Sequence, residues 1–195
     1  MFQFKKIILK DIAIIIAIIF ITAMFFSCTN NKKEVQDFLA DKNLPIAIGK
    51  NIFHVYKDSG KISSKLITPL LHDYTNRKEH PYNEFPEGIK IISFDKNGKD
   101  STTITANYAL TYNNTRISEI KDNVVIVNHS ENTVLETNQL YWDQREKYFF
   151  TEHGFRLRSP ADTVNGFGFE SKQDLSQYTA KDITGIIRAK EENLQ

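Results

Sequence analysis

The chain has 195 residues, with 25 Lys and Arg against 24 Asp and Glu, and it contains a single Cys. This length predicts one domain with a short additional segment, and a net charge of +1 argues against a dedicated nucleic-acid-binding protein. One cysteine excludes an intrachain disulfide and a multi-cysteine zinc site. With 41% hydrophobic and 12% aromatic residues, the chain is too apolar to be classed as disordered.

The N-terminus has the pattern of an export signal. Lysines precede an apolar run over 12–26, and Ser27 and Cys28 follow this run directly. A basic start, a short apolar stretch and a small residue predict export of the rest of the chain. We interpret 1–27 as a signal that is cleaved before Cys28, whose thiol is then diacylated to hold the domain on a membrane. An uncleaved anchor over 7–26 and an ordinary cleaved signal are the alternatives.

Residues 28–50 are predicted as a polar tether that contains one short helix over 34–40. After this tether, short runs of β-branched and aromatic residues alternate with turn signals. The strand candidates are, in chain order, 52–56, 62–71, 89–94, 101–112, 116–127, 133–142, 147–151, 155–158 and 163–187. The polar segment 72–87 is predicted as a loop or an irregular strand. The sequence therefore predicts an all-β antiparallel domain over 51–188, followed by a tail over 189–195.

Two tetrapeptides in the strand region are similar to each other. Residues 106–109 (Ala-Asn-Tyr-Ala) and 137–140 (Thr-Asn-Gln-Leu) each join a small residue, an Asn, a variable residue and an apolar residue. Their recurrence indicates stacked hairpins, although ordinary strand alternation also produces such matches.

The residue patterns of common enzyme sites are absent from the sequence. There is no Gly-x-Ser-x-Gly motif, the histidines lack a zinc-protease spacing, and 166–168 (Gly-Phe-Gly) lacks the third glycine of a dinucleotide-binding loop. No catalytic residue, metal site or cofactor is therefore predicted. Trp142 and the aromatic run 148–150 fit either a packed core or an apolar groove for lipid chains.

Four features, taken in order, carry a resemblance to a known family. The first two are the anchoring N-terminus with its tether and the Asp-Ser-Gly turn at 58–60. The third is Phe-Pro-Glu-Gly-Ile-Lys-Ile-Ile-Ser-Phe-Asp-Lys-Asn-Gly at 85–98, with Ile-Thr-Ala-Asn-Tyr-Ala after it. The fourth is Leu-Glu-Thr-Asn-Gln-Leu-Tyr-Trp-Asp at 135–143, with Gly-Phe-Gly-Phe-Glu after it. Together they resemble the periplasmic bridge proteins of lipopolysaccharide transport, the LptC family. Known members keep one spanning helix, so the Cys28 ending is a departure.

This resemblance implies an open, twisted antiparallel β-jellyroll with an apolar interior. It implies that the protein accepts lipopolysaccharide from the subunits of an inner-membrane ABC transporter and passes it along a bridge of periplasmic β-jellyroll proteins. It also places the domain in the periplasm of a Gram-negative cell envelope, anchored to a membrane, with the inner membrane favoured. No enzymatic step belongs to this role.

Strand alternation selects candidates for the lining of a lipid groove. The candidates are Ile91, Ile104, Ala106, Tyr108, Val125, Leu140, Tyr148, Phe150, Phe155, Leu157 and Phe169. Packing in an ordinary core is the alternative for the same residues. By the resemblance, Gly166 and Gly168 lie near the C-terminal edge where the next bridge protein docks, and a structural bend is their alternative role.

Two functions from other classes stay open at this point. One is a membrane-anchored β-sandwich that binds a protein or a glycan without a lipid conduit, and the other is a hydrolase with dispersed catalytic residues. Ser101 and Thr163 lie in short Asp-Ser/Thr segments that look like the O-glycosylation acceptors of some bacterial envelopes.

Overall fold

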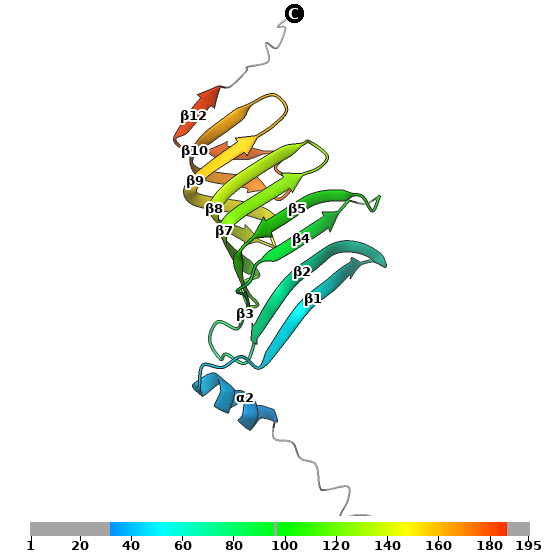
Figure 1. Cartoon of the computed structure of the whole chain (residues 1–195), viewed down its shortest axis with the longest axis vertical. Helices are drawn as coiled ribbons and strands as arrows, with labels where there is room; N and C mark the ends of the chain where they lie inside the picture. The colour runs from blue at the N-terminus through cyan, green and yellow to red at the C-terminus, as the bar shows by residue number, and fades with distance from the viewer. Residues whose placement is uncertain (1–31, 96, 187–195) are drawn as a thin grey trace, which may run out of the picture. The chain divides into compact units, whose positions relative to one another are not determined.

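The computed structural model describes residues 32–95 and 97–186 (Figure 1). The predicted signal over 1–27, the lipidation site Cys28 and the tail over 189–195 lie outside the described residues. Their predicted roles therefore stay predictions.

The chain divides into two units, Met1–Phe38 and Leu39–Gln195. Helix α2 (Lys32–Asp41) extends across their boundary and confirms the short helix predicted over 34–40. In the described part of the chain, no helix combines the length and the apolar character that crossing a membrane requires.

The described strands of the second unit form one antiparallel sheet, which confirms the all-β prediction. They are β1 (Ala47–Asp58), β2 (Lys61–Tyr74), β3 (Tyr82–Phe85), β4 (Ile89–Phe94), β5 (Asp100–Ala106), β6 (Tyr108–Tyr112), β7 (Ile117–Asn128), β8 (Thr133–Asp143), β9 (Tyr148–Arg158), β10 (Thr163–Lys172), β11 (Tyr178–Ala180) and β12 (Ile183–Ile186). Their order in the sheet is β11–β10–β9–β8–β7–β5–β4–β2–β3–β6, with β1 paired to β2, β12 paired to β10, and β6 also paired to β7.

The sheet folds into two layers because β2, β7 and β10 change neighbours along their length. For example, β7 pairs with β5 through 125–128 and with β6 through 117–121. We call the layer with β4, β5 and β12 the β5 layer, and the layer with β3, β6 and β11 the β6 layer. Figure 1 shows the long strands curving from one layer into the other. Inward side chains of both layers form one apolar core, as in a jellyroll-like fold.

A shared bend separates the two layers. Pairing registers shift there in β7, β8 and β10, and Asp122 and Gly168 adopt positive φ angles of 61° and 71°. The Asn107 amide, between β5 and β6, donates a hydrogen bond to the Asp122 carbonyl oxygen (2.9 Å). The similar tetrapeptides 106–109 and 137–140 both cross this bend, so their shared Asn marks the point where the chain changes layer.

Two buried threonines connect neighbouring segments at the bend. The hydroxyl oxygen of Thr137 lies 2.9 Å from the Gly154 carbonyl oxygen of β9. The hydroxyl oxygen of Thr68 lies 2.8 Å from the Gly88 carbonyl oxygen, just before β4. Each hydroxyl satisfies a carbonyl group where the regular ladder of the sheet is interrupted.

Several strand boundaries differ from those predicted. The candidates 147–151 and 155–158 are a single strand, β9, because the polar residues between them lie at the bend and point outward. The candidate 101–112 is divided into β5 and β6 at Asn107. The segment 72–87 contains the end of β2 and the whole of β3.

Candidate functional site

A cavity of about 820 Å³ lies between the two layers. Its walls come from β1, β2 and β4 on one side and from β3, β6, β7 and β8 in the β6 layer on the other. Directly paired residues of adjacent strands share a face of the sheet, so the lining side chains are arranged in rows that cross the strands. These rows differ in polarity with their distance from the bend.

The rows closer to the bend are apolar. In the β5 layer, the paired residues of β2, β4 and β5 are Leu66, Ile91 and Ile104. In the β6 layer, the paired residues of β3, β6, β7 and β8 are Phe85, Ala109, Ile120 and Leu140. All but Leu66 and Ile91 are buried members of the apolar core, and those two pack against it.

The next rows, farther from the bend, are polar. In the β5 layer they continue as Ser64, Ser93, Thr102 and Asn128. In the β6 layer they continue as Asn83, Thr111, Ser118 and Trp142. The cavity therefore has an apolar bottom at the bend and a polar lip above it, and Ile62 and Phe94 add apolar surface beyond this lip.

The polar row of the β6 layer is partly hydrogen-bonded to itself. Gln144 Nε2 donates to Ser118 Oγ (2.7 Å), and Ser118 Oγ lies 2.8 Å from Thr111 Oγ1. Trp142 pairs directly with Ser118 across β7 and β8. Its buried indole N–H has no acceptor among the described residues.

Toward β9 and β10 the interior is filled by side chains. Phe149 and Phe169 are fully buried, and the Phe155 ring packs 5.0 Å from the ring of Phe169. Leu175, from the turn after β10, is also buried, and Asn128 Nδ2 donates to the Asp174 carbonyl oxygen of the same turn (2.5 Å). This turn closes the interior beyond the cavity.

The predicted groove residues lie in three environments. Ile91 lines the cavity. The residues that are buried in the apolar core are Ile104, Ala106, Leu140, Phe155, Leu157 and Phe169. The residues on the outer face of the sheet, where the inward orientation expected for them is not observed, are Tyr108, Val125, Tyr148 and Phe150.

Local sequence explains why these four residues point outward. The runs 124–127 and 148–150 are apolar at every position, so alternation does not reveal which side chains face inward. At Asn107 the bend interrupts the alternation, so that Ala106 and Ala109 face inward and Tyr108 faces outward. Cavity residues that alternation did not select include Leu66, Phe85, Ile89, Ala109 and Ile120. The Asn shared by the two tetrapeptides is the signal that would have located the change of phase.

Three tyrosine–glutamate pairs lie on the outer face, and two of them contain the outward residues Tyr108 and Tyr148. The hydroxyl groups of the tyrosines donate to carboxylate oxygens in the pairs Tyr108–Glu84 (2.9 Å), Tyr141–Glu119 (3.2 Å) and Tyr148–Glu170 (2.7 Å). Burial, together with the hydrogen bond to Glu84, raises the pKa of Tyr108 well above its usual value. The phenol therefore stays protonated and continues to donate.

Gly166 and Gly168 lie within β10, which is paired on both sides. A Cβ atom at Gly166 would lie 2.7 Å from the Asp182 carbonyl oxygen and 2.9 Å from the Phe155 ring, so close packing requires a glycine there. Gly168 has the positive φ of the bend. The strands of the described sheet that pair on one side only are β1, β11 and β12.

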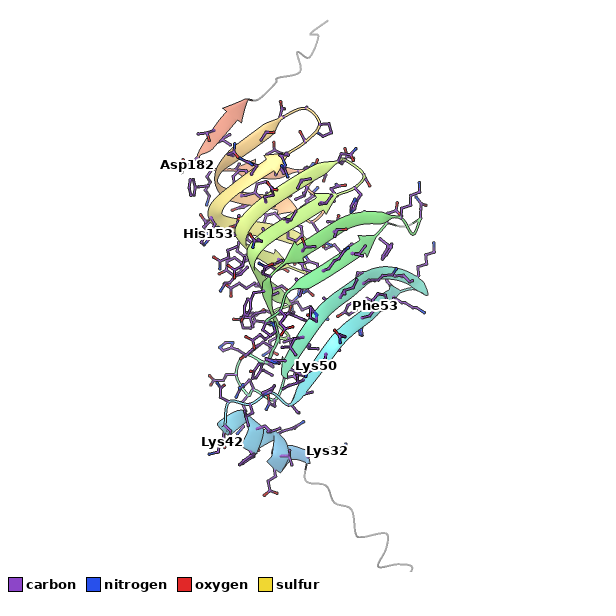
Figure 2. All side chains as sticks on the ribbon, viewed as in Figure 1. Lys32, Lys42, Lys50, Phe53, His153 and Asp182 are labelled. Carbon is purple, nitrogen blue, oxygen red and sulfur yellow. The ribbon has the colours of Figure 1, made fainter. Side chains whose placement is uncertain are left out.

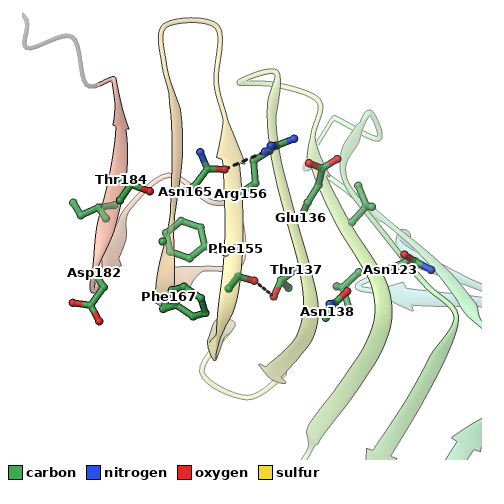
Figure 3. Close-up of a pocket in the computed structure, with 15 residues that line it drawn as sticks. Asn123, Glu136, Thr137, Asn138, Phe155, Arg156, Asn165, Phe167, Asp182 and Thr184 are labelled. Carbon is green, nitrogen blue, oxygen red and sulfur yellow. Dashed lines mark hydrogen bonds between the residues drawn. The ribbon is translucent and has the colours of Figure 1, made fainter.

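A second hollow, of about 900 Å³, lies over β7 to β10 and β12 (Figure 3). A row of paired outward residues crosses it, namely Val125, Glu136, Arg156, Asn165 and Thr184. Arg156 Nε donates to Asn165 Oδ1 within this row (3.1 Å). The hollow is therefore on the face opposite to the cavity.

Side chains that could ligate a metal ion are dispersed over the described residues. Within 32–95 and 97–186, no group of three or more His, Cys, Asp or Glu side chains is placed to hold a metal ion. His72 lies 3.3 Å from a carboxylate oxygen of Glu84, and His129 lies 2.8 Å from the Thr103 hydroxyl. Both contacts are on the outer face.

The comparisons with known proteins agree with this geometry. A family profile described as "Lipopolysaccharide-assembly, LptC-related" matches residues 12–182, well over half of the chain. A comparison with curated proteins found no match. The family match confirms the resemblance seen in the sequence, and the jellyroll-like sheet is the fold that this resemblance implied. The chain therefore belongs to the LptC-related family, which has a role in lipopolysaccharide transport.

Proposed function

We propose that the protein shields acyl chains of lipopolysaccharide in its interior cavity during transport across the periplasm. The observation that supports this proposal is the polarity gradient of the cavity, from the apolar rows at the bend to the polar rows at the lip. Acyl chains would lie at the bottom, and the sugar-bearing head would stay toward solvent. Each methylene group that leaves water contributes about 0.8 kcal/mol, so even partial shielding of a chain is favourable.

We further propose that the sheet edges join this protein to its partners. Edge strands have unpaired backbone groups to which another chain can add a strand. Strand β1 has exposed side chains at Ile48, Phe53 and Tyr56, and Figure 2 shows Phe53 on this strand. Because β1 is the first strand after the tether, we assign it to the inner-membrane ABC transporter, and we assign β11 and β12 to the next β-jellyroll of the bridge.

The proposed role also requires that the domain be held at a membrane. Lipidation at Cys28, with the domain in the periplasm at the inner membrane, is the arrangement that we propose, and an uncleaved anchor over 7–26 serves the same purpose. Movement of the lipid is driven by ATP hydrolysis in the transporter. No covalent bond of the lipid is made or broken, so no catalytic residue or cofactor is needed.

Photo-crosslinking in cells tests the conduit. A benzoylphenylalanine in place of Phe85, which lines the cavity, is expected to form an adduct with lipopolysaccharide. The same replacement of Phe150, which lies on the outer face against Tyr141, is expected to form none. Ile91 provides a second cavity position. If a folded, membrane-anchored protein formed no adduct at either cavity position, the conduit would be rejected in favour of a β-sandwich that binds a protein or a glycan.

A further inference from the structure

The polar lip of the cavity holds hydrogen-bond donors that the protein itself does not use. The indole Nε1–H of Trp142 is buried without an acceptor among the described residues, and an indole can only donate. Thr111 and Ser118 together have two hydroxyl protons, and one hydrogen bond joins the two oxygens. Because Gln144 already donates to Ser118, a proton of this pair is left to donate elsewhere.

These donors are next to one another. Trp142 and Ser118 are direct partners in the register of β7 and β8, and Ser118 and Thr111 are direct partners in the register of β7 and β6. Side chains in such positions have their Cβ atoms about 4.5–5.5 Å apart. The indole and the hydroxyl pair therefore belong to adjacent residues of one row, and all three residues line the cavity.

The depth of the donors indicates which part of an amphiphile they meet. Two residues closer to the bend along the same strands, in the adjacent row, are Ala109, Ile120 and Leu140, which are buried and apolar. A hydrocarbon chain that lies against Ala109 and Ile120, which line the cavity, places its first polar atoms beside Trp142. In acylated molecules, those atoms are the carbonyl oxygens of ester or amide links, which are acceptors only.

We propose that Trp142, with the Thr111–Ser118 hydroxyl pair, forms a subsite that binds the carbonyl oxygen of an acyl chain lying in the cavity. The inference rests on the proposed function, because it assigns a specific contact within the same cavity. The subsite selects acyl esters and amides over ethers and hydrocarbons of equal length. A buried donor without an acceptor carries a desolvation cost. A hydrogen bond from this donor to the carbonyl oxygen therefore contributes more binding free energy than an exposed hydrogen bond would.

The indole N–H itself reports on this contact. Trp142 is the only Trp of the chain, so the indole region of an amide ¹H–¹⁵N spectrum has one cross-peak. With the full chain in detergent micelles, monomyristoylglycerol is expected to move this peak downfield. The ether 1-O-tetradecylglycerol has the same head and a matched chain but no carbonyl group, and it is expected to leave the proton shift nearly unchanged. Equal shifts with both ligands would overturn the subsite.

A competition experiment measures the selectivity. Native mass spectrometry of the full chain with equal amounts of the two lipids gives the ratio of ester-bound to ether-bound protein. This ratio is expected to be about fivefold higher in the wild type than in Trp142→Phe, which corresponds to one hydrogen bond. Tyr141→Phe removes a polar atom from the outer face of the same strand and is expected to keep the wild-type ratio.

The outcomes separate this inference from the proposed function. If both lipids bind and Trp142→Phe leaves the ratio unchanged, the subsite is rejected and the lipid cavity stands. If neither lipid binds to the folded protein, the cavity function fails and the subsite fails with it. The spectrum of the wild type decides the question even if Trp142→Phe does not fold.

Discussion

At the scale of single residues, the glycines of β9 and β10 show how backbone packing limits the sequence. At Gly166 an added Cβ would meet the Asp182 carbonyl oxygen at 2.7 Å and the Phe155 ring at 2.9 Å. At Gly154 the nearest atom, in the Phe167 ring, is 3.4 Å away, which is an ordinary contact distance. The two glycines belong to neighbouring strands, yet only the first is required by its surroundings.

This difference predicts different effects of alanine at the two positions. Gly166→Ala is expected to lower the free energy of unfolding by about 1–3 kcal/mol, because β12 or the Phe155 ring must move. Gly154→Ala is expected to change it by less than about 0.5 kcal/mol. Urea denaturation of both variants measures the two changes. Equal destabilisation would show that the approach of Asp182 to β10 is not what requires the glycine.

At the scale of elements, the bend is the feature that turns one sheet into two layers. Thr137 is buried and its hydroxyl lies 2.9 Å from the Gly154 carbonyl oxygen, at the point where the register of β8 and β9 shifts. Thr103 has a hydroxyl in a similar contact with His129 (2.8 Å), but on the exposed face of β5. The same chemical group is therefore found at the bend in Thr137 and in a regular strand in Thr103.

Replacing each threonine by valine tests how much each hydroxyl group contributes to stability. Thr137→Val is expected to cost about 1–2 kcal/mol of unfolding free energy, because it leaves a buried carbonyl group without its donor. Thr103→Val is expected to cost less than about 0.5 kcal/mol. Thermal unfolding of the two variants gives the comparison. A negligible effect of Thr137→Val would mean that the bend does not depend on this hydroxyl.

The bend also explains how far the sequence predicted the elements and the site. Alternation located most strands and assigned Ile104, Leu140 and Leu157 correctly to the interior, because each lies in a regular run of its strand. It placed Tyr148 and Phe150 on the inner face, whereas both lie on the outer face, because a run of three aromatic residues does not show which side chains face inward. Alternation also did not predict the apolar and polar rows of the cavity. These rows depend on the register between strands that are not consecutive in sequence, such as β2 with β4 and β3 with β6.

At the scale of the whole molecule, the two ends of the sheet differ in their exposed side chains. Phe53 is 61% exposed on β1, which is paired on one side only, and Phe167 is 64% exposed on β10, which is paired on both. The two phenylalanines are equally accessible, so substitutions at either are expected to leave folding intact. They differ in whether an incoming strand could pair beside them.

The proposed docking of the transporter at β1 therefore predicts unequal effects. Phe53→Lys is expected to reduce several-fold the amount of transporter subunits that co-purify with the full chain, because a charge on an edge strand opposes strand addition. Phe167→Lys is expected to leave this amount unchanged. Quantitative mass spectrometry of the affinity-purified full chain measures both amounts. Equal recovery with the two variants would remove β1 as the docking edge.

The polar rows of the cavity have one more consequence, which concerns movement. Each row runs across the strands, so successive residues such as Asn83, Thr111 and Ser118 are one strand spacing apart, about 4.8 Å. A lipid that slides along the cavity by one strand exchanges one hydrogen-bonding side chain for the next at the same depth. In the proposed role, its head stays at the lip while its chains stay at the apolar bottom. Under the proposed function, an amphiphile in the cavity would therefore meet hydrogen-bonding side chains at intervals of one strand.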